Sequence, residues 1–259
     1  MTNRSSSTPS QRSVRVAETA DAATAAARAL VVECAERAIA ARGRFAIALS
    51  GGATPQKLHA SLVTAGLDWT KVLIFFGDER CVPPEHADSN FRLARESLLS
   101  KIAIPATNVH RIYAESPDKD AAAIEYAREL VRVLGDPQGL SKTDDVPRLD
   151  LVMLGLGGDG HTASLFPGST ALEADRELVV ATWVERLATH RITLTARTIN
   201  AARAVVFLVT GADKAGIVKD VLEGPFAPAR LPSQLVAPVN GAYTWLLDRA
   251  AAAQLARTA

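Results

Sequence analysis

The sequence predicts an α/β protein with a layered, mostly parallel sheet (Rossmann-like) and helices on both faces. Continuous apolar runs rich in valine, isoleucine, leucine and phenylalanine recur along the chain. Such runs are typical of strands covered on both faces. Helical segments alternate with them, which favours parallel strands joined by crossover helices. The composition does not shift along the chain, so we expect one catalytic domain over residues 13–259.

The apolar runs predict where the strands lie. We expect them at residues 14–17, 45–50, 72–77, 149–155, 178–182, 191–195, 204–210 and 243–247. An alanine-rich helix is expected over 20–41, ended by Gly43, and a second over 121–134, ended by Gly135. A third helix is expected to begin at Thr54 as its N-cap, with Pro55 in the first helical position.

Length, charge and cysteine content limit the function classes. At 259 residues the chain can bury a sizeable core without disulfides or metals. Its net charge of +1 gives no electrostatic reason to expect nucleic acid or a membrane as partner. The 2 cysteines, Cys34 and Cys81, suit a reducing cytoplasmic compartment. No apolar run predicts a membrane-spanning helix, and the polar, serine-rich residues 1–12 are expected to be a disordered tail rather than a secretory signal.

The most informative segment is 149–169, in which an apolar strand runs into a glycine-rich loop containing Asp159 and His161. Open α/β sheets bind ligands at the carboxyl ends of their strands, so these two residues are the first candidates for chemistry. The loop also matches the glycine spacing of dinucleotide-binding proteins. Pro167 interrupts the helix which that motif requires, and Asp159 would repel a pyrophosphate, so we expect no cofactor. Acidic residues beyond the loop keep the nicotinamide alternative open.

Two other strand ends carry candidate binding residues. After the strand at 45–50, Gly51 and Gly52 precede a helix start, where backbone N–H groups and the helix dipole favour an anion such as phosphate. An ordinary glycine turn is the alternative. After the strand at 72–77, Arg80 can hold an oxyanion or a phosphate, or it pairs with Glu79 or Glu85. Asp78 either faces the same cleft or caps the following turn.

His161 is the candidate general base, because an imidazole exchanges protons near neutral pH. Asp159 could orient the ring and stabilise its protonated form. No third residue has metal-ligand spacing nearby, so no metal is expected. Arg191 and Lys214 could add positive charge to a phosphate site, although a single lysine or arginine side chain is usually exposed to solvent.

Together these residues make the chain resemble the 6-phosphogluconolactonases of the pentose phosphate pathway. The matching blocks are LSGGATP (49–55), FFGDERCVP (75–83), SNFRLARESLL (89–99), LGLGGDGHTASLFPG (154–168), HRITLT (190–195) and TGADKA (210–215). The resemblance implies a fold shared with glucosamine-6-phosphate deaminases and a metal-free hydrolysis of a phosphorylated sugar lactone. It implies catalytic roles for His161, Asp159 and Arg80, and substrate contacts at Ser50, Gly51, Gly52, Thr54, Asp78, Gly158, Arg191 and Lys214. Lys219 is a nearby competitor for the role of Lys214.

Two rival functions remain at this point. An amino-sugar-phosphate isomerase or deaminase would use the same phosphate loop and histidine, but deaminases that resemble this chain carry a glutamate where Phe166 stands here. A phenyl ring cannot relay a proton, so the resemblance favours the lactonase. A non-catalytic sugar-phosphate sensor would need a DNA-binding helix pair, for which the polar tail is too short.

Overall fold

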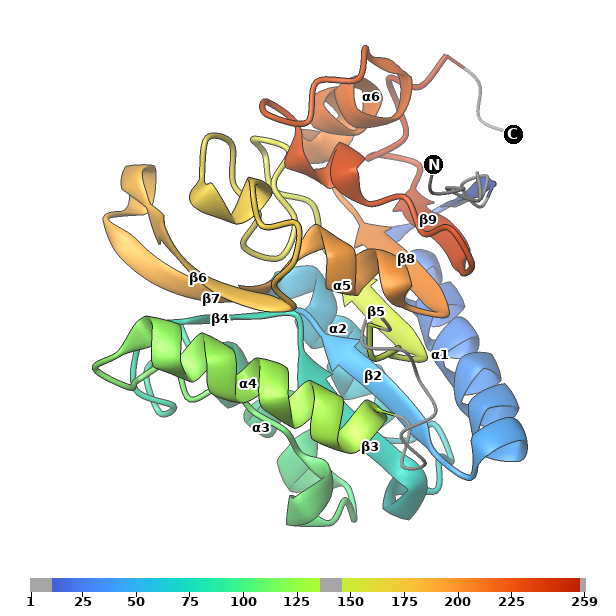
Figure 1. Cartoon of the computed structure of the whole chain (residues 1–259). Helices are drawn as coiled ribbons and strands as arrows, with labels where there is room; N and C mark the ends of the chain where they lie inside the picture. The colour runs from blue at the N-terminus through green and yellow to red at the C-terminus, as the bar shows by residue number, and fades with distance from the viewer. Residues whose placement is uncertain (1–10, 136–145, 257–259) are drawn as a thin grey trace, which may run out of the picture.

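The computed structural model describes residues 11–135 and 146–256. Within them, a parallel six-stranded sheet has the strand order β1-β9-β8-β5-β2-β3 (Figure 1). Its strands are β1 (Arg12–Ala17), β2 (Phe45–Leu49), β3 (Val72–Phe76), β5 (Leu151–Leu154), β8 (Ala204–Val209) and β9 (Ala242–Asp248). Most of the predicted tail lies outside the described residues, and β1 begins at its last residue.

The helices are α1 (Ala20–Arg42), α2 (Ala53–Leu62), α3 (Asn90–Ser97), α4 (Lys119–Leu134), α5 (Ala196–Ala201) and α6 (Ala215–Glu223). Helices α1 and α2 pack against each other, while α5 lies across the sheet from them (Figure 1). As expected, α1 ends at Gly43, whose φ of 75° is the left-handed conformation that glycine adopts without strain. No helix in the described part of the chain is both long and apolar enough to cross a lipid bilayer.

The predicted strands at 178–182 and 191–195 exist, but they do not belong to the parallel sheet. They are β6 (Val179–Val184) and β7 (Thr189–Leu194), which pair antiparallel with each other. Strand β7 also pairs with the unpredicted short strand β4 (Asp78–Arg80). β6 and β7 are joined by a 3-10 turn, Glu185–Leu187, rather than by a crossover helix. Without that helix the pair forms a hairpin, so parallel pairing is not available to it.

The start of α2 also differs from the expectation. The helix begins at Ala53, and Gly52 is its N-cap with a φ of 107°, a conformation that residues with a side chain rarely adopt. Thr54 is therefore inside the first turn, and its hydroxyl contacts Thr210 Oγ1 at 3.0 Å instead of capping the helix. Because no side chain caps the N-terminus of α2, its first N–H groups remain available to a ligand.

His59 of α2 is buried against α3. Its Nδ1 contacts Ser97 Oγ at 3.3 Å, while that hydroxyl donates to Leu93 O at 2.6 Å, so the ring donates the first of these bonds. Burial disfavours the charged imidazolium and lowers the pKa of His59 from 6.5 to about 4.

We expect His59 to make folding stability fall with acidification. The folded protein binds the His59 proton less tightly than the unfolded chain does, so stability decreases as pH falls from 6.5 toward about 4. The loss amounts to at most about 3 kcal/mol. Urea unfolding of wild type and His59→Asn at neutral and acidic pH measures it. The free energy of unfolding of His59→Asn should depend less on pH than that of wild type. His86→Asn, in an exposed loop, should keep the wild-type dependence. The same dependence on pH in all three proteins would contradict the role of His59.

Candidate active site

The carboxyl ends of four neighbouring strands, β8, β5, β2 and β3, surround a cavity of about 450 Å³. Most residues singled out in the sequence line it. The predicted residues at its wall are Ser50, Gly51, Gly52, Thr54, Asp78, Arg80, His161 and Lys214. Lining residues that the sequence did not single out include Thr162, Ala163, Thr210 and Asp213. All four lie inside the matching blocks 154–168 and 210–215, but only the fold shows that they line the cavity.

The loop between β2 and α2 must be glycine-rich for a packing reason as well as a conformational one. A Cβ atom on Gly51 would lie 1.7 Å from Asn90 Oδ1, far inside contact distance. Asn90 thus fills the space behind the loop, and its Nδ2 donates to the backbone oxygen of Asp78 at 2.9 Å. The loop presents backbone at the cavity wall beside the uncapped start of α2, an arrangement suited to an anion.

Asp78 lies buried at the cavity wall and is held from two sides. Its carboxylate accepts a hydrogen bond from Ser164 Oγ at 2.6 Å and another from Asn90 Nδ2 at 3.1 Å. Ser164 belongs to the loop that carries His161, so Asp78 connects that loop to β4. Arg80, two residues on, anchors one guanidinium nitrogen on Asp88 O at 2.5 Å and also lines the cavity.

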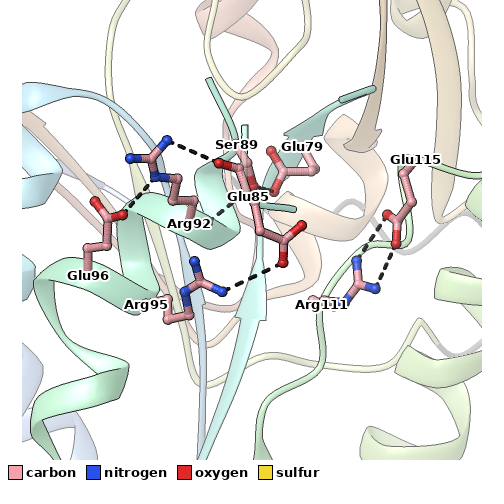
Figure 2. A network of polar contacts seen from close by, with 8 residues as sticks. All are labelled: Glu79, Glu85, Ser89, Arg92, Arg95, Glu96, Arg111 and Glu115. Carbon is pink, nitrogen blue, oxygen red and sulfur yellow. Dashed lines mark hydrogen bonds and ion pairs between the residues drawn. The ribbon is translucent and has the colours of Figure 1, made fainter. Parts of the chain in front are cut away.

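Glu79 is a structural residue that sequence reasoning did not single out. Its buried carboxylate accepts the backbone N–H groups of Arg80, Asn90 and Phe91 at 2.7–2.8 Å. Burial raises the pKa of this carboxyl, against the effect of these donors. Figure 2 shows Glu79 beside Ser89 at the start of α3. On the outer side of α3, Arg92 pairs with Glu96 of the same helix, and Arg95 pairs with Glu85, which precedes the helix. Glu79 therefore fixes the junction of β4 and α3.

His161 has the surroundings expected of a general base. Its Nδ1 hydrogen-bonds to Asp159 Oδ1, which leaves Nε2 as the nitrogen free for proton transfer. The ring stacks on Phe166 with centroids 4.1 Å apart. Partial burial raises the pKa of the Asp159 carboxyl, but the hydrogen bond from His161 and the charges of His161 and Arg186 outweigh it and lower the pKa to about 2. Asp159 is thus a carboxylate at any ordinary pH.

The basic residues Lys214, Lys219 and Arg191 differ in whether they line the cavity. Lys214 lines the cavity, whereas Lys219 is exposed on α6 and does not, so the geometry favours Lys214. Arg191 lies directly across from Arg80 in the β4–β7 register and is not part of the cavity wall. Its Nε and Nη1 atoms are buried and have no hydrogen-bond partner among the residues that the structure describes. Burial, followed by the charge of Arg80, lowers the pKa of Arg191. Its contact with phosphate stays a prediction, as does that of Gly158, which lies outside the cavity wall.

In the described part of the chain, no three histidine, cysteine, aspartate or glutamate side chains converge as metal ligands would. The chemistry that this arrangement can support is proton transfer by His161 next to an anion-binding loop and two basic side chains, Arg80 and Lys214.

A family model described as glucosamine-6-phosphate isomerases/6-phosphogluconolactonase matches residues 18–245. The chain belongs to this family. A 6-phosphogluconolactonase of Nostoc sp. is 39% identical over 227 residues, which cover 87% of this chain and 91% of the relative. The structure of 6-phosphogluconolactonase from Trypanosoma cruzi has a TM-score of 0.84 at 28% identity and covers 97% of this chain and 100% of its own. These matches confirm the resemblance and the fold class expected from sequence.

A monomeric glucosamine-6-phosphate deaminase has a TM-score of 0.77 with 20% identity, covering 93% of this chain and 99% of its own. At that identity the likeness shows a shared fold alone. The likeness to this deaminase therefore does not decide between the two activities in the family's description.

Gly157 supplies a test of the His161 geometry in this family member. A Cβ atom at Gly157 would lie 1.9 Å from His161 Nδ1, so Gly157→Ala must displace the ring. We expect kcat to fall about a hundredfold, the usual effect of misplacing a catalytic group by about 1 Å, with circular dichroism unchanged. Gly216→Ala, where the nearest atom would be 3.9 Å away, is the control. Normal turnover in Gly157→Ala would show that the ring position does not matter.

Proposed function

We propose that the protein hydrolyses 6-phospho-D-glucono-1,5-lactone to 6-phospho-D-gluconate in the oxidative pentose phosphate pathway. The observation that carries the proposal is the placement of His161, backed by Asp159, at the wall of a cavity whose other side is an anion-binding loop. The curated and structural relatives named as 6-phosphogluconolactonases support it. The free thiols of Cys34 and Cys81 support a reducing, cytoplasmic setting.

The reaction begins with a proton transfer to His161. Because Nδ1 donates to Asp159, Nε2 accepts a proton from water, and the resulting hydroxide attacks the C1 carbonyl of the lactone. The charge that develops on the carbonyl oxygen is stabilised by Arg80 or by backbone N–H groups at the cavity wall. Asp159, ionised throughout, stabilises the imidazolium that forms.

Collapse of the tetrahedral intermediate breaks the bond between C1 and the ring oxygen. The imidazolium returns its proton to that oxygen, which leaves as the C5 hydroxyl, and His161 is restored as a base. The phosphate, bound by the Ser50–Gly52 loop and Lys214, holds the lactone in the orientation that the attack requires.

Phe166 argues against the deaminase reaction. Sugar ring opening needs a second acid or base next to the histidine, and the side chain stacked on His161 is a phenyl ring that can neither accept nor donate a proton. Lactone hydrolysis needs only one group that gives back the proton it has taken.

We expect the purified protein to hydrolyse 6-phosphogluconolactone above the spontaneous rate and to release no ammonia from glucosamine 6-phosphate. His161→Ala should lower kcat by about two to four orders of magnitude, the contribution of a general base, with an unchanged fold. The two substrates are assayed side by side. Ammonia release without lactone hydrolysis would assign the deaminase reaction instead, and inactivity toward both would favour a non-catalytic sensor.

Lys214→Ala should raise KM for the phosphorylated lactone about ten- to hundredfold, because it removes a charge-assisted contact worth about 1.5–3 kcal/mol. KM for unphosphorylated glucono-1,5-lactone should change little. Lys219→Ala, on the exposed face of α6, is the matched control and should resemble wild type. Equal effects of Lys214→Ala on both lactones would show that Lys214 does not recognise the phosphate.

A further inference from the structure

Arg186 lies next to the catalytic pair although it is distant from it in the sequence. It belongs to the 3-10 turn Glu185–Leu187 that joins β6 to β7. These strands stay paired up to Val184, which directly precedes the turn, and Thr189, which follows it after Ala188. Strand β7 pairs in turn with β4, which carries Asp78 and Arg80. The turn is therefore held by hydrogen-bonded strands at a defined place beside the cavity.

The Arg186 side chain contacts two residues that hold the His161 ring. Its Nη1 lies 3.1 Å from Asp159 Oδ2, while the other carboxylate oxygen binds His161 Nδ1. Oδ2 is buried, and none of the described residues donates an aligned hydrogen bond to it, so Arg186 neutralises this oxygen as an ion pair. The guanidinium also lies 5.5 Å from the centre of the Phe166 ring, whose face stacks on His161.

This arrangement has an electrostatic consequence for the base. The Asp159 carboxylate favours the protonated form of His161, and a positive charge on the far side of that carboxylate opposes this preference. A general base is active only while it is unprotonated. A positive charge paired with Asp159 therefore acts against protonation of the base.

We propose that Arg186 is a positioning residue of the lactonase site, which pairs with Asp159 and thereby limits how strongly that carboxylate stabilises protonated His161. The proposal rests on the proposed role of His161 as the base. Arg186 does not line the cavity, so it acts through Asp159 and Phe166 rather than on the substrate.

Other charged groups lie at the same cavity as His161. Asp78 and Arg80 from β4, and Asp213 and Lys214 from the turn before α6, line the same cavity. They are unchanged in a variant of Arg186, so the difference between variant and wild type isolates the effect of Arg186.

The test compares Arg186→Gln, which removes the charge, with Arg186→Lys, which keeps it. Arg37→Gln, in an exposed ion pair with Glu33 on α1, is the control for a change in net charge. The His161 ring is titrated by nuclear magnetic resonance, with its signal assigned by its loss in His161→Gln. We expect the midpoint to rise by about half a pH unit in Arg186→Gln, the size for charges several ångströms apart at a water-exposed site. Arg186→Lys and Arg37→Gln should match wild type.

The kinetics supply a second measurement. The acid limb of kcat/KM for the phosphorylated lactone should move to higher pH in Arg186→Gln, while KM on the alkaline plateau stays unchanged. A ring midpoint that is unchanged or lower in Arg186→Gln would overturn the proposal. If the proposed function is wrong, the wild-type protein will not hydrolyse the lactone. The ring titration would still decide whether Arg186 acts on His161.

Discussion

The parallel pairing of β8, β5, β2 and β3 is the constraint on which the site depends. Parallel neighbours end at the same edge, so the loops that follow them meet around one cavity although they are far apart in sequence. Gly77 joins this sheet to the second one: its N–H donates to Leu49 O in β2 at 2.8 Å, and its oxygen accepts from Leu194 N in β7 at 2.9 Å. Because β4 follows β3 directly after Gly77, Asp78 and Arg80 lie at the cavity formed by the carboxyl ends of the parallel strands.

Close packing explains where glycine is required within the site. At Gly51 and Gly157 the space for a Cβ atom is occupied by the side chains of Asn90 and His161. At Gly155 and Gly158 that space is open. The glycine spacing that resembles a dinucleotide fingerprint therefore has a different physical origin here, because one of these glycines, Gly157, makes room for the His161 ring.

The polar groups at the site divide into those that are satisfied within the protein and those that are not. The carboxylates of Asp78 and Glu79 are bound by neighbouring hydroxyl, amide and backbone donors. Lys214 Nζ lies 3.7 Å from Asp213 Oδ2, and two buried guanidinium nitrogens of Arg191 have no hydrogen-bond partner among the described residues. The side chains of Arg80 and Lys214 thus stay at the cavity wall, where they can contact a phosphorylated substrate.

Features that depend on neighbouring residues could be predicted from the sequence. Each apolar run coincides with a strand of the structure, and short motifs at the strand ends made His161, Asp159, Arg80 and the glycine loop candidates for the site. Four other features could be found only in the folded structure. Strands β6 and β7 form a separate antiparallel sheet with β4, α2 starts before Thr54, Lys214 rather than Lys219 lines the cavity, and Arg186 contacts Asp159. Each of these depends on which distant segments pack together, since a residue pattern specifies periodicity along the chain but not the partner that a strand or side chain meets across space.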